Sequence, residues 1–414
     1  MKKVSVIIPY YNGENYIATA LESLKKQTYS NFEVILVNNN SSDNSEDICK
    51  KAAENDSRFK CVNESTQGIA SALNTGIKNA AGEIIAFLDQ DDIYLEDRIS
   101  ETVNLLENEK VDCIACRGYK VDETLKIFGE TNEYNISREL IPFYLLQDNL
   151  VTSLSYFTIR KSMLEKYLPL PSKYSNMLDY FLMMNFIKNN EKTVFCNKLL
   201  VKRRYHNTNI SLNIAAKAHQ IIPLLIEYYQ SYEVINRIVS KEGFQKVITK
   251  RYIDSVQSLR RQNRFNEMID FMTEYVKSNY ILKEFYLYFA GIAMLRINKE
   301  HVRDFIEDNK IQHPLYYFIK GLYCYEKKFF EESAKCFTKA YKKSGRRFLE
   351  ALNSKALAEY FIDKKKSFKI IKKVINIDPF YNDSLLNLGF MKKNNEKLFK
   401  HSIMSPKTIT YFLI

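Results

Sequence analysis

Short apolar runs alternate with amphipathic stretches along the first 90 residues, and this alternation constrains the fold more than any other feature of the chain. Strand-like runs, rich in β-branched residues, occupy residues 4–8, 32–37 and 84–88. Helical periodicity fills the intervals, at residues 16–27, 45–55 and 69–80. Strands that alternate with helices in this way form a parallel sheet with helices on both faces. The pattern therefore predicts an α/β domain.

Polar segments follow these strand-like runs at their carboxyl ends. They are residues 9–12, 38–40 and 89–92. The carboxyl ends of parallel strands meet at one edge of a sheet, and ligands bind in the crevice outside that edge. We therefore expect these three segments, far apart in the sequence, to converge on one site.

The third segment carries three carboxylates within four positions, Asp89, Asp91 and Asp92. Like charges at the end of a buried strand are unfavourable unless a cation neutralises them. Oxygen ligands select a hard divalent ion, which typically also binds phosphate oxygens. The segment therefore predicts a site for Mn²⁺ or Mg²⁺ beside a diphosphate. The simpler alternative is that these aspartates cap a helix or face solvent.

The charge of the chain is unevenly distributed. Residues 1–110 hold 11 Lys and Arg against 18 Asp and Glu, whereas the rest of the chain holds 50 against 31. A basic rear half suits an anionic membrane surface or an anionic acceptor, although solvated lysine-rich helix faces explain it equally well. No motif for nucleic-acid binding accompanies it, so we expect no nucleic-acid partner. The lone pair Cys113 and Cys116 is expected in a strand, not in a metal site.

After residue 212 the strand-like runs disappear and helical patterns continue to the end. Gly321, Lys355 and Gly389 are evenly spaced and mark a weak repeat. Apolar residues recur at matching offsets, Phe337 and Ala340 in one unit and Ile371 and Val374 in the next. The spacing resembles that of tetratricopeptide repeats, in which helix pairs stack into a solenoid. The chain departs from them at Lys355, Ser333 and Ser367, where small residues or alanine are usual.

The first hundred residues resemble the family 2 glycosyltransferases of the GT-A fold. The resemblance rests on VSVIIPYYNGENYIATALESLKKQTYSNFEVILVNNNSSDNS and on QGIASALNTGIKNAAGEIIAFLDQDD, and it continues more loosely to about residue 211. It implies a domain that binds a nucleotide-sugar. The residues at the matching positions are Pro9 and Tyr11 along the nucleoside, Asn38 and Asn39 at the base, Gly68, Asp89 toward the ribose, and Asp91 on the metal.

The resemblance extends to the catalytic groups. It makes Asp179 the general base that takes a proton from the acceptor hydroxyl, although the acid that usually precedes it is Leu178 here. It makes His206 a candidate metal or phosphate ligand and Arg204 a candidate diphosphate ligand. Asparagine at positions 38 and 39, and Leu73 where many relatives have arginine, leave the base open. We expect a UDP-sugar donor, with dTDP and GDP as alternatives.

These features together predict an inverting, metal-dependent hexosyltransferase that acts on a hydroxyl of a glycan or lipid-linked acceptor in cell-surface polysaccharide or lipooligosaccharide synthesis. The expected domains are a GT-A domain at residues 1–212 and a helical domain at residues 213–414, tetratricopeptide-like from about 315. We expect a cytoplasmic protein; a peripheral contact with the inner membrane face and self-association are left open. The competing hypothesis is a helical-repeat adaptor with a vestigial transferase domain, because positions 38, 39, 73 and 178 depart from the family pattern.

Overall fold

The computed structural model divides the chain into two compact units, Met1–Ser240 and Lys241–Ile414. It describes all residues except 207–213, 263, 277–289, 292–311, 379–381 and 393–414. The predicted domain boundary at residues 212 and 213 lies outside the described residues. Helices α8 (Ile214–Ser231) and α9 (Glu233–Ile238) belong to the first unit. The α8 residue Gln220 accepts a hydrogen bond of 2.9 Å from the backbone amide of Asn176, which ties this helix to the α/β part.

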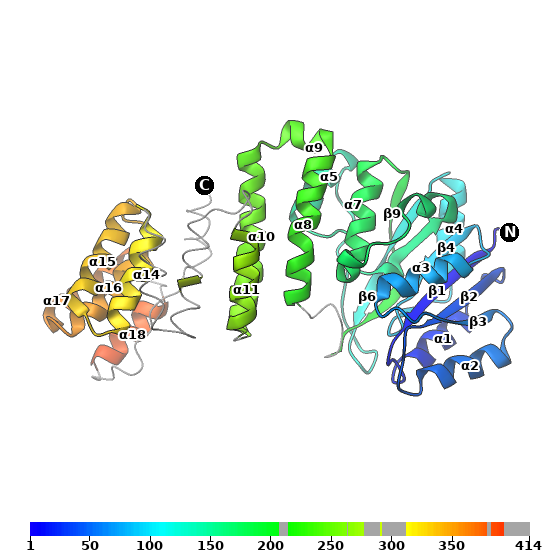
Figure 1. The fold of residues 1–414 in the computed structure, drawn as a ribbon, viewed down its shortest axis with the longest axis horizontal. Coiled ribbons are helices and arrows are strands. Elements are labelled where there is room, and N and C mark those ends of the chain that lie inside the picture. The colour runs from blue at the N-terminus through cyan, green and yellow to red at the C-terminus, as the bar shows by residue number, and fades with distance from the viewer. Residues whose placement is uncertain (207–213, 263, 277–289, 292–311, 379–381, 393–414) are drawn as a thin grey trace. The chain divides into compact units, whose positions relative to one another are not determined.

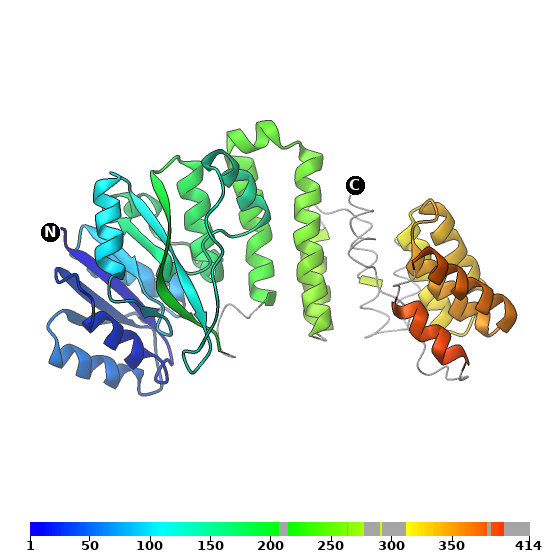
Figure 2. The same ribbon diagram turned by 180° about the vertical axis from the view of Figure 1, so that it is seen from behind.

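The first unit is built on a nine-stranded sheet with the order β3-β2-β1-β4-β8-β6-β9-β5, and β7 pairs with β6. The strands are β1 (Val4–Tyr10), β2 (Phe32–Asn38), β3 (Phe59–Asn63), β4 (Ile84–Phe87), β5 (Ile93–Tyr94), β6 (Cys113–Val121), β7 (Ile127–Glu130), β8 (Phe157–Arg160) and β9 (Thr193–Arg204). The helices of this part are α1 (Ile17–Lys25), α2 (Ser45–Asn55), α3 (Ile69–Asn79), α4 (Arg98–Asn108), α5 (Ile141–Gln147), α6 (Lys161–Leu164) and α7 (Leu178–Lys188). Helices α3 and α7 lie in front of the sheet in Figure 1, and α1, α2 and α4 come to the front in Figure 2.

The sheet is parallel in its first half and mixed in its second half. Strands β3, β2, β1 and β4 run parallel, as the alternation of strands and helices predicts. Strand β8 is antiparallel to both β4 and β6, whereas β6 and β9 are parallel. The α/β fold class is confirmed, and the mixed half is a feature that the predicted parallel arrangement did not include. Strand β1 continues through Pro9 to Tyr10. Proline has no amide hydrogen to donate, and this is tolerated because β4 pairs with β1 only as far as Ile7, while β2 alone pairs with it to Tyr10.

Two buried polar side chains hold this sheet to its surroundings. Glu33 on β2 is 2% exposed and accepts hydrogen bonds from Ser5 Oγ at 2.7 Å, Lys60 Nζ at 2.8 Å, the Ala81 amide at 2.7 Å and Lys3 Nζ at 3.0 Å. A separate fully buried guanidinium, that of Arg98 in the first turn of α4, lies 4.3 Å from the centre of the Tyr94 ring. It donates to the carbonyl oxygens of Ser155 at 3.1 Å and Phe157 at 2.7 Å. Arg98 thereby fixes the segment that leads into β8.

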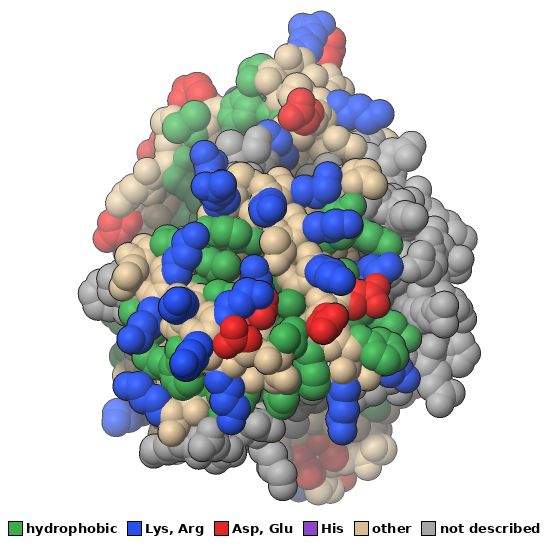
Figure 3. Space-filling model, turned by 90° about the vertical axis from the view of Figure 1, so that its left-hand side faces the viewer, with side chains coloured by type: hydrophobic (Ala, Val, Ile, Leu, Met, Phe, Trp, Pro, Cys, Tyr) green, Lys and Arg blue, Asp and Glu red, His purple; other side chains and the backbone are tan. Residues whose placement is uncertain are grey.

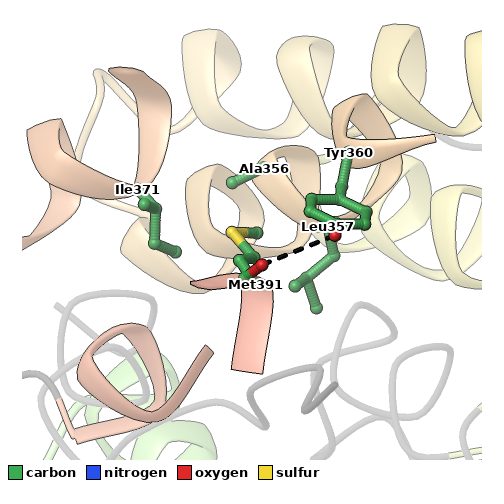
Figure 4. Close-up of a cluster of buried hydrophobic side chains, with 5 residues drawn as sticks. All are labelled: Ala356, Leu357, Tyr360, Ile371 and Met391. Carbon is green, nitrogen blue, oxygen red and sulfur yellow. Dashed lines mark hydrogen bonds between the residues drawn. The ribbon is translucent and has the colours of Figure 1, made fainter. Parts of the chain in front are cut away.

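The described part of the second unit is helical. Its helices are α10 (Lys241–Arg261), α11 (Phe265–Val276), α14 (Pro314–Glu326), α15 (Phe330–Lys343), α16 (Leu349–Tyr360), α17 (Lys364–Ile377) and α18 (Asn382–Lys392). The residues expected to repeat are buried, since Phe337, Ala340, Ile371 and Val374 are all 0% exposed. Figure 4 shows Ile371 in a cluster with Ala356, Leu357, Tyr360 and Met391.

Serine replaces the usual alanine at two equivalent positions of this helical part, and the structure gives a reason. Ser333 and Ser367 are both fully buried. The Ser333 hydroxyl donates to the Gly321 carbonyl at 2.8 Å, and the Ser367 hydroxyl donates to the Ala356 carbonyl at 2.6 Å. Each serine therefore joins the two helices of its pair by a satisfied hydrogen bond. A helical carboxyl-terminal part is established; its assignment to the tetratricopeptide class stays a prediction.

Within the described ranges, no helix is both long enough and apolar enough to cross a bilayer.

Candidate active site

The first loop and the acidic segment contact each other directly. The Tyr11 amide donates to Gln90 Oε1 at 2.9 Å, and Gln90 Nε2 donates to the Tyr11 carbonyl at 3.2 Å. The same loop reaches the segment after β2, because the Ser42 amide donates to Asn12 Oδ1 at 2.8 Å. The three polar segments that follow β1, β2 and β4 thus meet at one edge of the sheet, as expected. Tyr11 itself is 48% exposed there, whereas Pro9 is buried within β1.

The two asparagines at the end of β2 are buried and hydrogen-bonded to the protein. Asn38 Oδ1 accepts from the Ser41 amide at 3.0 Å. Asn39 Nδ2 donates to the carbonyl oxygens of Glu64 at 3.1 Å and Thr66 at 2.8 Å, and its Oδ1 accepts from the Gly68 amide at 2.7 Å. Asn39 therefore positions the loop that ends at Gly68, whose φ of +129° favours glycine. Direct contact of either asparagine with a nucleotide base stays a prediction.

The three aspartates after β4 lie in distinct surroundings. Asp89 receives a hydrogen bond from the Ser153 hydroxyl at 3.0 Å, and its own amide donates to Ser155 Oγ at 2.9 Å. Asp92 is 2% exposed and accepts from the Arg204 amide at 3.0 Å. Burial, with the charge of Asp91 added, raises the pKa of Asp89 to about 6, and the same causes raise the pKa of Asp92 well above its usual range. The site thus concentrates negative charge that a bound cation would stabilise.

Asp91 is brought against His206 from the end of β9. Asp91 Oδ2 lies 2.8 Å from His206 Nε2, although 115 residues separate them in the chain. The His206 ring stacks on Tyr16 with centroids 4.3 Å apart, and the Arg204 guanidinium lies 5.1 Å from the centre of the Tyr16 ring. Arg204 is only 5% exposed. The structure thus brings Asp91 and His206 together, and their metal-binding role stays a prediction.

Asp91 and His206 fit a divalent ion whose remaining ligands come from a bound nucleotide and water. Asp91 and His206 offer one carboxylate oxygen and one imidazole nitrogen. Over the described ranges, no three His, Cys, Asp or Glu side chains together form a complete metal-binding group. Mg²⁺ and Mn²⁺ at nucleotide sites commonly take one or two protein ligands and fill the other positions with phosphate oxygens and water. A two-ligand protein site is compatible with that kind of ion.

Asp179 lies in the first turn of α7. Its Oδ2 accepts from Asn149 Nδ2 at 3.2 Å, and its Oδ1 accepts from the Tyr180 amide at 2.8 Å. Its negative charge contributes to the raised pKa of Asp89, so the two carboxylates are within electrostatic reach. Leu178, in the place of the usual first acid, is 2% exposed and belongs to the core.

A cavity of about 170 Å³ lies in the α/β part. Its lining includes Tyr134, Tyr144, Asn149, Tyr156, Arg203 and Tyr205. Asn149 is the residue that holds Asp179, and Arg203 Nη1 donates to Thr152 Oγ1 at 3.0 Å. Tyr156 is fully buried, and its hydroxyl has no hydrogen-bond partner among the residues that the structure describes.

Several residues of this site were not predicted from the sequence. Ser153 and Ser155 hold Asp89, and Tyr16 supports His206. The two serines alternate with apolar residues just before β8. They lie in and beside a 3-10 turn, Leu154–Tyr156, where a strand period of two does not apply, so the sequence carried no usable signal for them. Tyr16 carries no signal either, because only the folded chain brings it to His206.

Comparison with known proteins identifies the family. The model of the family described as "Glycosyl transferase family 2" matches residues 5–168. An uncharacterized glycosyltransferase of Rickettsia typhi is 33% identical over 221 residues, 51% of this chain and 67% of that protein. The chain belongs to glycosyltransferase family 2.

Other relatives extend the similarity. The Escherichia coli UDP-Glc:alpha-D-GlcNAc-diphosphoundecaprenol beta-1,3-glucosyltransferase WfgD is 29% identical over 212 residues, 51% of this chain and 80% of WfgD. GlyA of Streptococcus pneumoniae is 34% identical over 126 residues, 30% of this chain and 18% of GlyA. The chain spans between 18% and 36% of the length of three curated relatives, GlyA among them. Among solved structures, Staphylococcus aureus TarS 1–349 in complex with UDP matches with a TM-score of 0.48 and 17% identity, over 84% of this chain and 93% of that one.

Proposed function

We propose that this protein is an inverting glycosyltransferase that moves a sugar from a nucleotide-diphosphate donor to a hydroxyl of a glycan or glycolipid. The observation that carries the proposal is the cluster at the sheet edge, where Asp91 lies against His206 and the first loop lies against Gln90. It supports a donor site in which Pro9, Tyr11, Asn38, Asn39, Gly68 and Asp89 surround the nucleotide-sugar. The relative WfgD uses UDP-Glc according to its name, which favours UDP here.

Asp91 and His206 would hold the divalent cation, Mn²⁺ or Mg²⁺. When bound, such a cation neutralises charge on the departing diphosphate. Asp89 and Asp92 would keep their hydrogen bonds from Ser153 and from the Arg204 amide when the cation binds. They fix the backbone that presents Asp91. The Arg204 side chain lies over Tyr16, so a contact with the diphosphate stays a proposal of its own.

Asp179 would act as the general base. Inverting transfer needs one carboxylate that takes the proton of the acceptor hydroxyl as that oxygen attacks the anomeric carbon. Hydrogen bonds from Asn149 and from the Tyr180 amide hold the Asp179 carboxylate in one orientation. The loss of the usual first acid at Leu178 leaves this single carboxylate for the role.

The cavity lined by Asn149, which donates to Asp179, would receive the acceptor. Its tyrosines provide flat apolar faces for a sugar ring, and Asn149 and Arg203 provide hydrogen-bond donors. WfgD acts on a diphosphoundecaprenol-linked sugar according to its name, which favours a lipid-linked acceptor and a place in cell-surface polysaccharide synthesis.

The competing proposal is an adaptor with an inactive transferase domain. Its motivation is that Leu73 and Leu178 are buried core residues at positions where many relatives carry charge. The two proposals differ in turnover. With Mn²⁺ present, a transferase releases the nucleoside diphosphate from at least one member of a panel of nucleotide-sugars, whereas an adaptor releases none.

The decisive experiment on the donor site is nucleotide binding by the variant Asp91→Asn. UDP titrated by calorimetry should bind the natural protein only when Mn²⁺ or Mg²⁺ is present, and Asp91→Asn should weaken it at least tenfold. Asp47→Asn, an exposed aspartate of α2, serves as the matched control and should bind as the natural protein does. Equal affinity with and without a divalent cation would remove the metal site from the proposal.

A further inference from the structure

Helices α15 and α17 present a strongly basic face to solvent. The segments 335–347 and 369–373 contain no Asp or Glu. Nine cationic side chains in them are exposed: Lys335, Lys339, Lys342, Lys343, Arg346, Arg347, Lys369, Lys372 and Lys373. Figure 3 looks onto the side on which these helices lie in Figure 1, and Lys and Arg side chains clearly outnumber acidic ones there. We call these nine residues the basic face.

The basic face follows from the repeat pattern of this unit. The buried side of α15 includes Ser333, Phe337 and Ala340, and the buried side of α17 consists of Ser367, Ile371 and Val374. Lysines occupy the opposite side of each helix, as expected for an amphipathic helix with one buried stripe. Lys335 and Lys369 are one repeat period apart, and so are Lys339 and Lys373. Equivalent positions of two successive helix pairs therefore carry the same charge.

Among the described residues, no ion pair joins an acidic side chain to any of the eight basic-face residues other than Arg347. Glu350 and Glu359 of α16 are buried, at 1% and 3% exposure. Glu359 pairs with Lys366, 2.7 Å away, which is not one of the nine. The exposed acids Glu331 and Glu332 lie in the first turn of α15, before the basic face begins.

We propose that the basic face docks on a bilayer that contains anionic phospholipids. Seven of its nine cations are lysines on long flexible stems, which suit a diffuse layer of lipid phosphates. Nucleic-acid recognition instead favours the fixed fork of arginine, with aromatic side chains for stacking on single strands. Arginine contributes only Arg346 and Arg347 to this face. The inference does not depend on the transfer reaction, because it uses only residues of the second unit.

The test is co-sedimentation of the full-length protein with vesicles of one part phosphatidylglycerol to two parts phosphatidylcholine, compared with pure phosphatidylcholine. The natural protein should bind the anionic vesicles and not the neutral ones, and sodium chloride at about 0.5 M should release it. The variant Lys335→Gln/Lys339→Gln/Lys369→Gln/Lys373→Gln removes four exposed charges at little cost to helix propensity. Each lysine near an anionic surface contributes about fivefold in partitioning, so the partition coefficient should fall by more than about 100-fold.

A matched control carries the same change of net charge elsewhere. Lys26, Lys51, Lys78 and Lys192 are exposed lysines of the first unit. Their replacement by glutamine should lower vesicle binding by less than about threefold. Equal loss in both quadruple variants would overturn the proposal, because general charge would then explain binding. If the natural protein stays in the supernatant when anionic vesicles are pelleted, but shifts a labelled DNA oligonucleotide, the proposal is overturned in favour of a nucleic-acid partner.

Discussion

Replacement of Glu33 by glutamine tests the physical account of the sheet most directly. Burial by itself would raise the pKa of this carboxyl group. The hydrogen bonds from Lys60, Ser5, the Ala81 amide and Lys3 outweigh burial and lower its pKa to about 2. The ordinary value is 4.5. This difference corresponds to about 3 kcal/mol of stability from the ionised form, at about 1.4 kcal/mol per pH unit.

The pH dependence has a definite sign. Because the pKa is lower in the folded protein, the contribution of Glu33 is complete above about pH 4.5 and is lost as the pH falls toward about 2. Glutamine keeps the shape of the side chain but cannot ionise. We therefore expect Glu33→Gln to lower the free energy of unfolding by about 3 kcal/mol at pH 7 and by only about 1 kcal/mol at pH 3.

Urea unfolding at several pH values, followed by circular dichroism, measures this difference. The signal comes from secondary structure, which suits a chain without tryptophan. Glu54→Gln, an exposed glutamate of α2, is the control and should change stability by less than about 0.5 kcal/mol at each pH. A stability difference for Glu33→Gln that stays constant between pH 7 and pH 3 would refute the reasoning, because the charge on Glu33 would then not be what stabilises the sheet.

Three further predictions concern the site. Asp179→Asn should lower kcat by at least 100-fold while the Kd for UDP changes less than twofold, as measured by product release and calorimetry; an unchanged kcat would exclude Asp179 as the base. Tyr156→Phe removes a buried unpaired hydroxyl, so thermal unfolding should show equal or greater stability; a clearly lower unfolding temperature would contradict this. Arg98→Met leaves the Ser155 and Phe157 carbonyls without their hydrogen-bond donor, so the free energy of unfolding in urea should fall by about 3 kcal/mol. Nucleotide-sugar binding should also weaken, because Ser153 and Asp89 lie beside that segment; a fully stable variant would contradict this.

The sequence alone was sufficient for the features that depend on local periodicity and on strand ends. The apolar runs predicted β1, β2 and β4, and the parallel order placed the segments after them at one edge. The even spacing of the repeat predicted which residues of α15 and α17 are buried. These features follow from side-chain periods of two and 3.6, which can be read along the chain.

Only the tertiary structure decided the features that depend on distant contacts. The antiparallel insertion of β8 between β4 and β6 puts Ser153 and Ser155 beside Asp89, and the end of β9 brings His206 to Asp91 and the Arg204 amide to Asp92. No local pattern encodes these pairings, because strand order depends on which faces the whole chain can bury together. For the same reason, the charge of Glu33 and the free hydroxyl of Tyr156 acquire their meaning only inside the fold, where burial makes an unpaired polar group costly and a paired one stabilising.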